Sequence, residues 1–368
     1  MSAATSVGTP EGAGVLFFGG YDPGYPRNAI IRKGLKRCGV RVGECRVDTR
    51  LKVFFRYPAL LWRYMRTGGG ERIIFVPDFR HKDVPLAWLL ARCSGRRVVF
   101  DPLVSRYETR VLDRGDVAHG SMQSWHNRNI DALSLRLSHL VLADTSAHAR
   151  FYEEEFGVSP RKIRVLPVGF DEDVFQMSPL PDNRAHPTVL FYGTYLPLHG
   201  VETIVAAAAL LRGSPARFML VGEGQTYEAA KRMAAALPDD LVAFHPVVSL
   251  RDVARLLAEA DIVLGIFGNT PKASMVVPNK VFQALAVGRP LVTADTPAIR
   301  ELFTPGEHLL TVPPGDAASL ASAIKRLLAD ASLREGLAHG GCAYARSRFD
   351  SRGIGERLAA ILREEGLR

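Results

Sequence analysis

Two α/β domains, each built on a parallel sheet covered by helices, are predicted to face each other across a cleft. The chain has 368 residues, and at about 100–200 residues per domain this length suggests two. Short β-rich runs alternate with amphipathic helical runs along the chain, which requires crossover connections and parallel strands. The two halves also open alike, with VLFFGGYDPGY from Val15 and VLFYGTYLPLH from Val189. The sequence therefore predicts two doubly wound domains.

The first half contains six short apolar runs that suit buried parallel strands. These predicted strands are Val15–Gly19, Arg41–Val47, Arg72–Val76, Arg97–Phe100, Leu140–Ala143 and Ile163–Pro167. Amphipathic runs with helical spacing lie between them, and the predicted helices are Arg27–Arg37, Val84–Cys93 and Ala147–Phe156.

The second half repeats this scheme. Its predicted strands are Thr188–Tyr192, Arg217–Val221, Leu241–Phe244, Asp261–Ile266, Pro290–Thr293 and His308–Val312. Its predicted helices are Val201–Leu211, Tyr227–Leu237, Leu250–Ala260, Lys280–Val287 and Ala317–Leu328.

The domain boundaries follow from composition. Residues 1–14 are small and polar and are expected to form a loose tail, because no basic stretch leads into an apolar core. The domains are expected over 15–175 and 176–350, joined through the proline-containing linker Phe170–Pro187. A last helix within 352–368 is expected to pack back on the first domain.

Each half begins with a buried strand, a glycine-containing loop and a helix. The loop is Gly19, Gly20 and Tyr21 in the first half, and Gly193 and Thr194 in the second. Glycine lets the backbone approach a ligand closely, and the following helix directs its free N–H groups and positive dipole end there. One such loop alone could be a turn that binds nothing, but two matched loops favour anion sites on both sides of one cleft.

Composition excludes several classes of protein. Hydrophobic residues make up 47% and charged residues 23%, which is typical of a folded protein and not of a disordered or fibrous one. No uncharged apolar run reaches the roughly 18 residues of a membrane span. The four cysteines form no CxxC pair, which argues against a disulfide scaffold or a zinc site and fits a reducing cytoplasm.

The positive charge is concentrated near the N-terminus. Of a net charge of +9, residues 1–66 contribute +8, from 12 basic and 4 acidic residues. Such a region attracts anions, although a solvated basic surface explains it equally well. Within it, Arg50–Arg66 mixes basic, aromatic and aliphatic residues, which suits a helix on the anionic inner face of a membrane. Core packing of its apolar residues is the alternative, and Pro58 is expected to interrupt the helix.

Several blocks together resemble the retaining glycosyltransferases of family 4, which have the GT-B fold. The blocks are FYGTYLPLHGVETI (Phe191–Ile204), MLVGEG (Met219–Gly224), VAFHPVV (Val242–Val248), PNKVFQALAVGRPLVTADTPAIREL (Pro278–Leu302), FFGGYDPGYPRN (Phe17–Asn28), FDPLVSRYETRV (Phe100–Val111) and DTSAHARFYEEEFGVSPRKIRVLPVGFDEDVF (Asp144–Phe175). The resemblance implies transfer of a sugar from a nucleotide diphosphate sugar to a glycan or lipid-linked acceptor. It implies no metal and no other cofactor, because backbone amides, helix ends and basic side chains stabilise the departing diphosphate.

The resemblance places the donor phosphates near Gly193 and Thr194. The family often has Arg and Lys where this chain has Thr194 and His199, and His199 can donate one hydrogen bond or simply face solvent at a helix start. Lys280 lies near the start of a predicted helix, where its charge opposes the helix dipole unless an anion is bound there. Lys272 either reaches the same anion or is a solvated loop lysine.

The remaining donor-side residues are also assigned by the resemblance. Gln283 replaces the second Glu of the family's paired-glutamate motif and is expected at the ribose, while Met275 replaces the first Glu. Other expected donor contacts are Gly222, Gly224, Val247 and Glu301, of which Glu301 could instead only brace a helix.

On the acceptor side, Gly19, Gly20 and Tyr21 are expected near a phosphate or the acceptor. Asp101 follows a buried strand and is expected to orient or deprotonate the acceptor, unless it only starts a turn before Pro102. The rival functions are a nucleotide-sugar epimerase of the same fold and a non-catalytic nucleotide-sugar-binding protein. A nicotinamide enzyme is less favoured because no complete GxGxxG is present, and nucleic-acid binding has no motif behind it.

Overall fold

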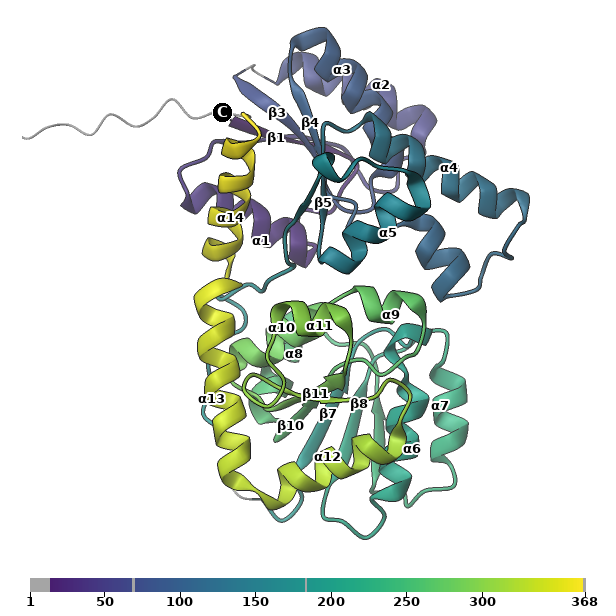
Figure 1. Ribbon diagram of the computed structural model, residues 1–368, viewed down its shortest axis with the longest axis vertical. Coiled ribbons are helices and arrows are strands. Elements are labelled where there is room, and N and C mark those ends of the chain that lie inside the picture. The colour runs from purple at the N-terminus through teal and green to yellow at the C-terminus, as the bar shows by residue number, and fades with distance from the viewer. Residues whose placement is uncertain (1–13, 68–69, 183, 367–368) are drawn as a thin grey trace, which may run out of the picture.

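The computed structural model describes residues 14–67, 70–182 and 184–366, which contain two six-stranded sheets (Figure 1). The first sheet runs β2-β1-β3-β4-β5-β6 and is made of β1 (Gly14–Gly19), β2 (Val42–Arg46), β3 (Glu71–Val76), β4 (Arg97–Phe100), β5 (Leu140–Ala143) and β6 (Ile163–Val165). The second runs β12-β11-β10-β7-β8-β9 and is made of β7 (Thr188–Tyr192), β8 (Arg217–Val221), β9 (Val242–His245), β10 (Ile262–Leu264), β11 (Leu291–Ala294) and β12 (Leu310–Val312).

Every strand pair in both sheets is parallel, as predicted. All six residues of β1 are buried, because helices cover both faces of the sheet. The predicted tail, residues 1–14, lies outside the described residues except for Gly14, which begins β1.

Helices fill both faces of each sheet (Figure 1). In the first domain they are α1 (Pro26–Arg37), α2 (Val53–Arg66), α3 (Val84–Ser94), α4 (Met122–Leu137) and α5 (Ser146–Phe156). In the second they are α6 (Val201–Leu210), α7 (Tyr227–Ala234), α8 (Leu250–Glu259), α9 (Pro271–Met275), α10 (Asn279–Val287), α11 (Pro297–Leu302) and α12 (Ala317–Ala329). None of the helices among the described residues combines the length and apolar character needed to cross a bilayer.

The strand orders fix where ligands can bind. The order of each sheet reverses beside its first strand, so that β1 lies between β2 and β3, and β7 lies between β8 and β10. In doubly wound sheets the crevice at the carboxyl ends of the strands beside this reversal is the usual ligand site. The loops after β1 and β7 are therefore the places to look for a site.

Helix α2 differs from the prediction. It runs without a break from Val53 to Arg66 with Pro58 inside it. Proline removes one backbone hydrogen bond, but the helix is anchored on both sides of it, by the buried Arg56 and the buried Leu60. Tertiary contacts therefore outweigh the local cost of Pro58.

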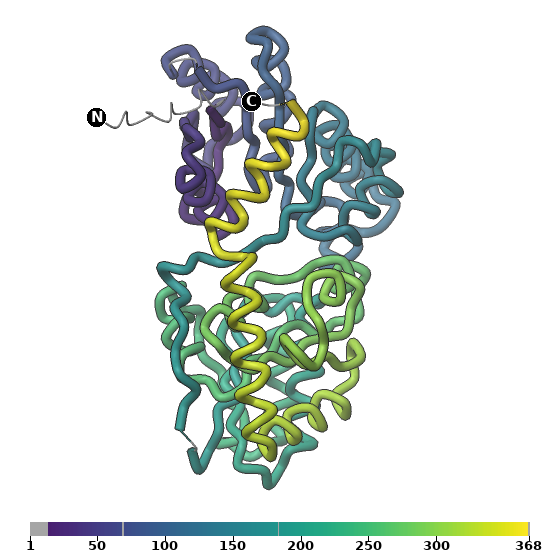
Figure 2. The backbone as a smooth tube through the Cα atoms, turned by 60° about the vertical axis from the view of Figure 1, so that its left-hand side comes forward, coloured from purple at the N-terminus to yellow at the C-terminus, as the bar shows by residue number. Residues whose placement is uncertain are grey.

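The chain crosses between the domains twice, and the two crossings lie side by side. The first leaves β6 towards β7, and the second joins α13 (Ala331–Arg348) to α14 (Ser351–Glu364). The Phe170 N–H donates to the Phe349 carbonyl oxygen at 2.9 Å, which links the crossings. Figure 2 shows α13 along the second domain and α14 continuing along the first.

Helix α14 packs directly on α1 through two glycines. A Cβ built on Gly355 would stand 2.3 Å from the carbonyl carbon of Gly34, and one built on Gly34 would stand 2.1 Å from the Ser351 carbonyl oxygen. Real Cβ atoms do not come this close to backbone, so the two helices touch only because both positions lack a side chain. This contact holds the end of the chain on the first domain.

We predict that Gly355→Ala lowers the free energy of unfolding by about 1–3 kcal/mol, the usual cost of overpacking a tight contact. Chemical denaturation measures this change. Gly336→Ala is the matched control, because Gly336 is also helical but has no atom within 4 Å of an added Cβ. The control is expected to be neutral or slightly stabilising. Equal effects of the two substitutions would contradict the close α1–α14 contact.

Candidate active site

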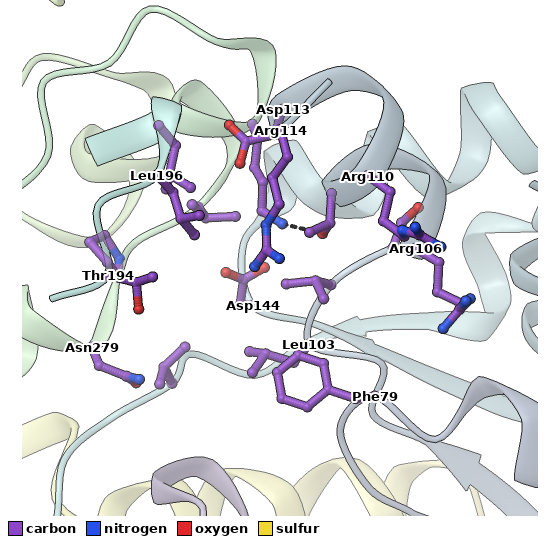
Figure 3. Close-up of a pocket in the computed structure, with 18 of the residues that line it drawn as sticks. Phe79, Leu103, Arg106, Arg110, Asp113, Arg114, Asp144, Thr194, Leu196 and Asn279 are labelled. Atoms are coloured by element: carbon purple, nitrogen blue, oxygen red, sulfur yellow. Dashed lines mark hydrogen bonds between the residues drawn. The ribbon is translucent and has the colours of Figure 1, made fainter. Parts of the chain in front are cut away.

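A cavity of about 410 Å³ lies between the two domains. Its first-domain wall comes from the loops that follow β3, β4 and β5, together with Tyr25 before α1 and Val168 after β6. Its second-domain wall comes from the loop after β7 and the segment around α9 and the start of α10. Figure 3 shows Thr194, Leu196 and Asn279 on one side, and Arg106, Arg110 and Phe79 on the other. The carboxyl ends of both sheets thus contribute to one site.

Two glycines make the second-domain wall possible. Gly193, directly after β7, has φ of +141°, and Gly222, after β8, has φ of +128°. A Cβ on Gly222 would stand 2.0 Å from the Gly193 carbonyl oxygen. Both positions therefore need glycine, and Thr194 follows as a residue that lines the cavity.

Lys280 is a buried lysine at the start of α10. It lies in the first turn of α10 with 4% of its surface exposed, and its Nζ has no hydrogen-bond partner among the described residues. Nζ stands 3.9 Å from the centre of the Phe191 ring, and burial holds the pKa of the ammonium well below its usual range. Lys280 does not itself line the cavity, but a Cβ on Gly193 would stand only 3.2 Å from Nζ.

His199 lines the cavity, but the one hydrogen bond that its neutral ring can donate goes to the protein backbone and not to a ligand. Its Nδ1 contacts the carbonyl oxygen of Thr194, to which Nδ1–H donates. Burial, with a smaller effect of the nearby Lys280 charge, holds the imidazole pKa well below its usual value, so the ring is neutral at pH 7. A neutral ring has only one N–H, and none is left for a phosphate.

Lys272 also lines the cavity, but its ammonium faces the first domain. Nζ donates to Thr109 Oγ1 at 2.5 Å and lies 3.7 Å from a carboxylate oxygen of Glu108. It is therefore a link between the domains rather than a solvated loop lysine.

Besides Gly193, Gly222 and Lys280, four further residues predicted on the donor side lie outside the cavity lining. The Oε1 atom of Gln283 accepts from the Tyr192 hydroxyl at 2.8 Å. Glu301 accepts from the Ser146 N–H at 2.8 Å, so it braces the start of α5 across the domain interface. Val247 is 63% exposed on the loop after β9, and Gly224 packs against the backbone of Tyr195.

The first-domain glycine loop does not line the cavity either, because it is occupied. The Gly20 N–H donates to Asp83 Oδ2 at 2.9 Å, and Asp83 is paired with Arg56 at 2.7 Å. Tyr21 is buried, and its hydroxyl donates to Glu44 at 3.3 Å. A protein carboxylate therefore takes the place that the sequence assigns to a ligand anion beside Gly19 and Gly20.

Asp101 is a structural carboxylate. Its two oxygens accept from Arg27 Nε at 2.6 Å and Nη2 at 2.7 Å, and both side chains are fully buried. Arg27 also donates to the carbonyl oxygen of Leu166, so the pair ties α1 to the end of β6. Asp101 is not part of the cavity wall, which instead includes the Asp144 carboxylate at the end of β5.

Sequence reasoning missed the residues that give the first-domain wall its charge. Arg106, Arg110 and Arg114 all line the cavity, and their spacing of four residues after β4 is the signal that could have revealed one helical face. No local pattern indicates that Phe79 and Leu103, two further wall residues, adopt positive φ angles of 61° and 59°. Such backbone is strained for bulky residues and occurs often at functional sites.

Behind this wall lies a buried charge network. His148 Nδ1 contacts Asp144 at 2.6 Å, and its Nε2 lies 3.4 Å from Glu108. Burial opposes the charge on His148, but the two carboxylates outweigh it and raise the imidazole pKa to about 9. The pKa of Glu108 falls to about 2, because the charges of Lys272 and His148 outweigh its burial.

Comparison with known proteins supports the predicted resemblance. Residues 186–330 match the model of the family described as Glycosyl transferases group 1. The alpha-D-kanosaminyltransferase of Streptomyces kanamyceticus is 27% identical over 184 residues, which cover 49% of this chain and 46% of the relative. The D-inositol 3-phosphate glycosyltransferase of Acidothermus cellulolyticus is 27% identical over 263 residues, covering 66% and 56%. The chain thus spans about half the length of the curated relatives it matches.

Solved structures extend the similarity over nearly the whole chain. Sucrose-phosphate synthase of Thermosynechococcus elongatus superposes with a TM-score of 0.72 at 18% identity, covering 96% of this chain and 98% of that one. Anabaena Alr3699/HepE in complex with UDP and glucose has the same TM-score and identity, covering 96% and 100%. At this identity the similarity concerns the fold alone, which is the predicted GT-B fold.

We predict that the charge on His148 stabilises the folded protein at neutral pH and that this stabilisation is lost as the pH becomes alkaline. A group whose pKa is raised by folding contributes its stabilisation fully below the unfolded value, near 6.5, and loses it as pH rises through the folded value, about 9. The wild type should therefore lose at most about 3 kcal/mol over this range relative to His148→Gln, which cannot titrate. Denaturation of both proteins from pH 6 to pH 10 measures the difference. A constant difference would contradict a charged His148.

Proposed function

We propose that this chain is a retaining glycosyltransferase that moves a sugar from a nucleotide diphosphate sugar to a hydroxyl of a glycan or lipid-linked acceptor. The observation that carries the proposal is the buried Nζ of Lys280, which lies beside the glycine loop after β7 and has no hydrogen-bond partner among the described residues. An ammonium buried without an acceptor is costly, and a bound anion would offset that cost.

A diphosphate fits this place for three reasons. Lys280 lies in the first turn of α10, where free N–H groups and the helix dipole favour negative charge. Gly193 has no side chain to stand between the cavity and Nζ. The loop follows the strand at which the sheet order reverses, and the similar Anabaena protein was solved in complex with UDP.

The chemistry requires stabilisation of the leaving group. As the sugar–phosphate bond breaks, negative charge grows on the diphosphate, and a fixed ammonium with helix N–H groups lowers the barrier by stabilising that charge. These groups supply the charge that a metal ion would otherwise bring, so we propose that transfer needs no metal. We assign the role of orienting the acceptor hydroxyl to Asp144, which lines the cavity, and not to Asp101, which does not.

The two rival functions share the donor site but differ in turnover. An epimerase would change the nucleotide sugar without an acceptor, and a non-catalytic protein would bind it without releasing the diphosphate. The matched relatives are named as transferases, which favours transfer.

We also propose that α2 lies on an anionic membrane surface. Its large apolar side chains that point outward are Phe54, Phe55, Leu61, Trp62 and Met65, each between 41% and 82% exposed. Core packing explains the buried Leu60 and the partly buried Tyr57, Ala59 and Tyr64, but not these exposed side chains. Basic residues stand beside this face, and the Arg66 guanidinium lies 3.7 Å from the centre of the Trp62 ring. An amphipathic helix with aromatic and basic residues is the form that binds such surfaces.

We predict that Lys280→Met abolishes most of the thermal stabilisation by the best ligand in a panel of nucleoside diphosphates. Loss of a charged hydrogen-bond partner should weaken binding about tenfold or more. The free variant should be as stable as the wild type or more so, because the substitution removes a desolvated ammonium. Lys325→Met on the exposed side of α12 is the matched control and should keep the full thermal shift.

Turnover tests the rest of the function. Release of the nucleoside diphosphate should depend on an acceptor, persist in the presence of EDTA and give a product with the donor's anomeric configuration, as read by NMR. Binding without release would favour the non-catalytic alternative, and an inverted product would exclude a retaining enzyme.

We predict that the protein floats with phosphatidylcholine vesicles only when they contain phosphatidylglycerol. The double substitution Phe54→Ser and Trp62→Ser should release it, because each ring contributes about 1.5–3 kcal/mol when buried. Met122→Ser is the control, since Met122 is 84% exposed on a different helix. Equal flotation with neutral vesicles, or of both variants, would argue against α2 as the membrane contact.

A further inference from the structure

One wall of the cavity carries more positive charge than the donor site needs. Arg106, Arg110 and Arg114 line it at four-residue intervals, on a segment that includes the π-helical turn Glu108–Asp113. Like charges four residues apart on a helix repel each other. A segment that places three of them on one cavity therefore needs something to compensate their charge.

Groups of the protein compensate these arginines only in part. Among the described residues, Nε of Arg106 and Nε of Arg114 are buried without a hydrogen-bond partner. Arg106 donates through Nη2 to Asn127 at 3.0 Å, and Arg110 lies 3.6 Å from Asp116. Burial lowers the pKa of Arg106, which is the sign of a cation removed from water.

The acidic side chains of the cavity are occupied elsewhere. Asp113 Oδ1 accepts from the Thr270 hydroxyl at 2.9 Å, and Asp144 contacts His148 at 2.6 Å. The cavity lining thus contains four basic residues, including Lys272, against two acidic residues that already have partners. An anionic ligand would complete this arrangement.

The arginines are not placed for the donor diphosphate. Figure 3 shows Arg106 and Arg110 on the far side of the cavity from Thr194 and Asn279, while Arg114 reaches between the two sides. The proposed phosphate site lies on the Thr194 side, beside Gly193 and Lys280. Arg106 and Arg110 therefore face the cavity from the wall opposite the proposed phosphate site.

We propose that Arg106 and Arg110 bind an anionic group on the acceptor, a phosphate or a carboxylate, and so select a charged acceptor sugar. Guanidinium groups suit both anions, because their planar N–H pairs match two oxygens at once. This inference rests on the proposed function, and it adds a chemical class for the acceptor. It also assigns specificity to residues that make no contact with the donor.

Binding to the protein loaded with UDP, or with the best nucleoside diphosphate of the panel, tests the proposal. Glucose 6-phosphate, glucuronate and glucose are titrated by calorimetry, and at least one charged sugar should bind more tightly than glucose. Arg106→Gln and Arg110→Gln should each weaken that binding about tenfold and leave nucleotide affinity unchanged. Arg106→Lys and Arg110→Lys should each keep part of that binding. Arg150→Gln, an exposed charge on α5, is the control and should have no effect.

The outcomes separate the two proposals. Equal binding of all three sugars, binding of none, or an equal loss of nucleotide and sugar affinity in the arginine variants would overturn the charged acceptor while leaving the transferase intact. Conversely, if Lys280→Met and the wild type bind nucleotides equally, the donor site is wrong. Titration of charged sugars without nucleotide then tests the arginines by themselves. Because Arg106 also contacts Asn127, Arg110→Gln alone decides the result if the Arg106 variant does not fold.

Discussion

The close contact between α14 and α1 is the constraint on which the shared cavity depends. Two parallel sheets present ligand-binding loops only at the carboxyl ends of their strands. These edges form one site only if the domains are held with the edges facing each other. The glycine contact at Gly34 and Gly355 holds the C-terminal helix on the first domain, and the Phe170–Phe349 hydrogen bond links the two crossings.

Local patterns predicted the fold and part of the site. Strand runs, glycine loops and the basic residue at the start of α10 are visible within short windows, and the structure has the parallel sheets and the Gly193 loop beside Lys280. The errors come from partners that are distant in sequence. Asp101 is paired with Arg27, which lies 74 residues away in the sequence. The Gly20 N–H donates to Asp83, which lies 63 residues away. No window of the sequence shows that these pairs meet.

The electrostatics of the cavity follow from which cations are already paired. Lys272 contacts Thr109 and Glu108, and Arg27 is paired with Asp101. These two cations therefore stabilise the fold and are not free to bind a ligand. By contrast, Nζ of Lys280 and the Nε atoms of Arg106 and Arg114 have no hydrogen-bond partner among the described residues. The function we propose uses this division, with the donor on one wall and the acceptor on the other.

The side-by-side crossings also set how substrates can enter. Links across the cavity join Thr109 to Lys272, Asp113 to Thr270 and the Arg114 carbonyl to Gln225. These three hydrogen bonds, together with those between Ser146 and Glu301, involve residues outside the crossings and can break while the crossings stay intact. Rotation of the domains about the side-by-side crossings, acting as a hinge, would then open the cavity. Substrates and products would enter and leave at the side opposite that hinge.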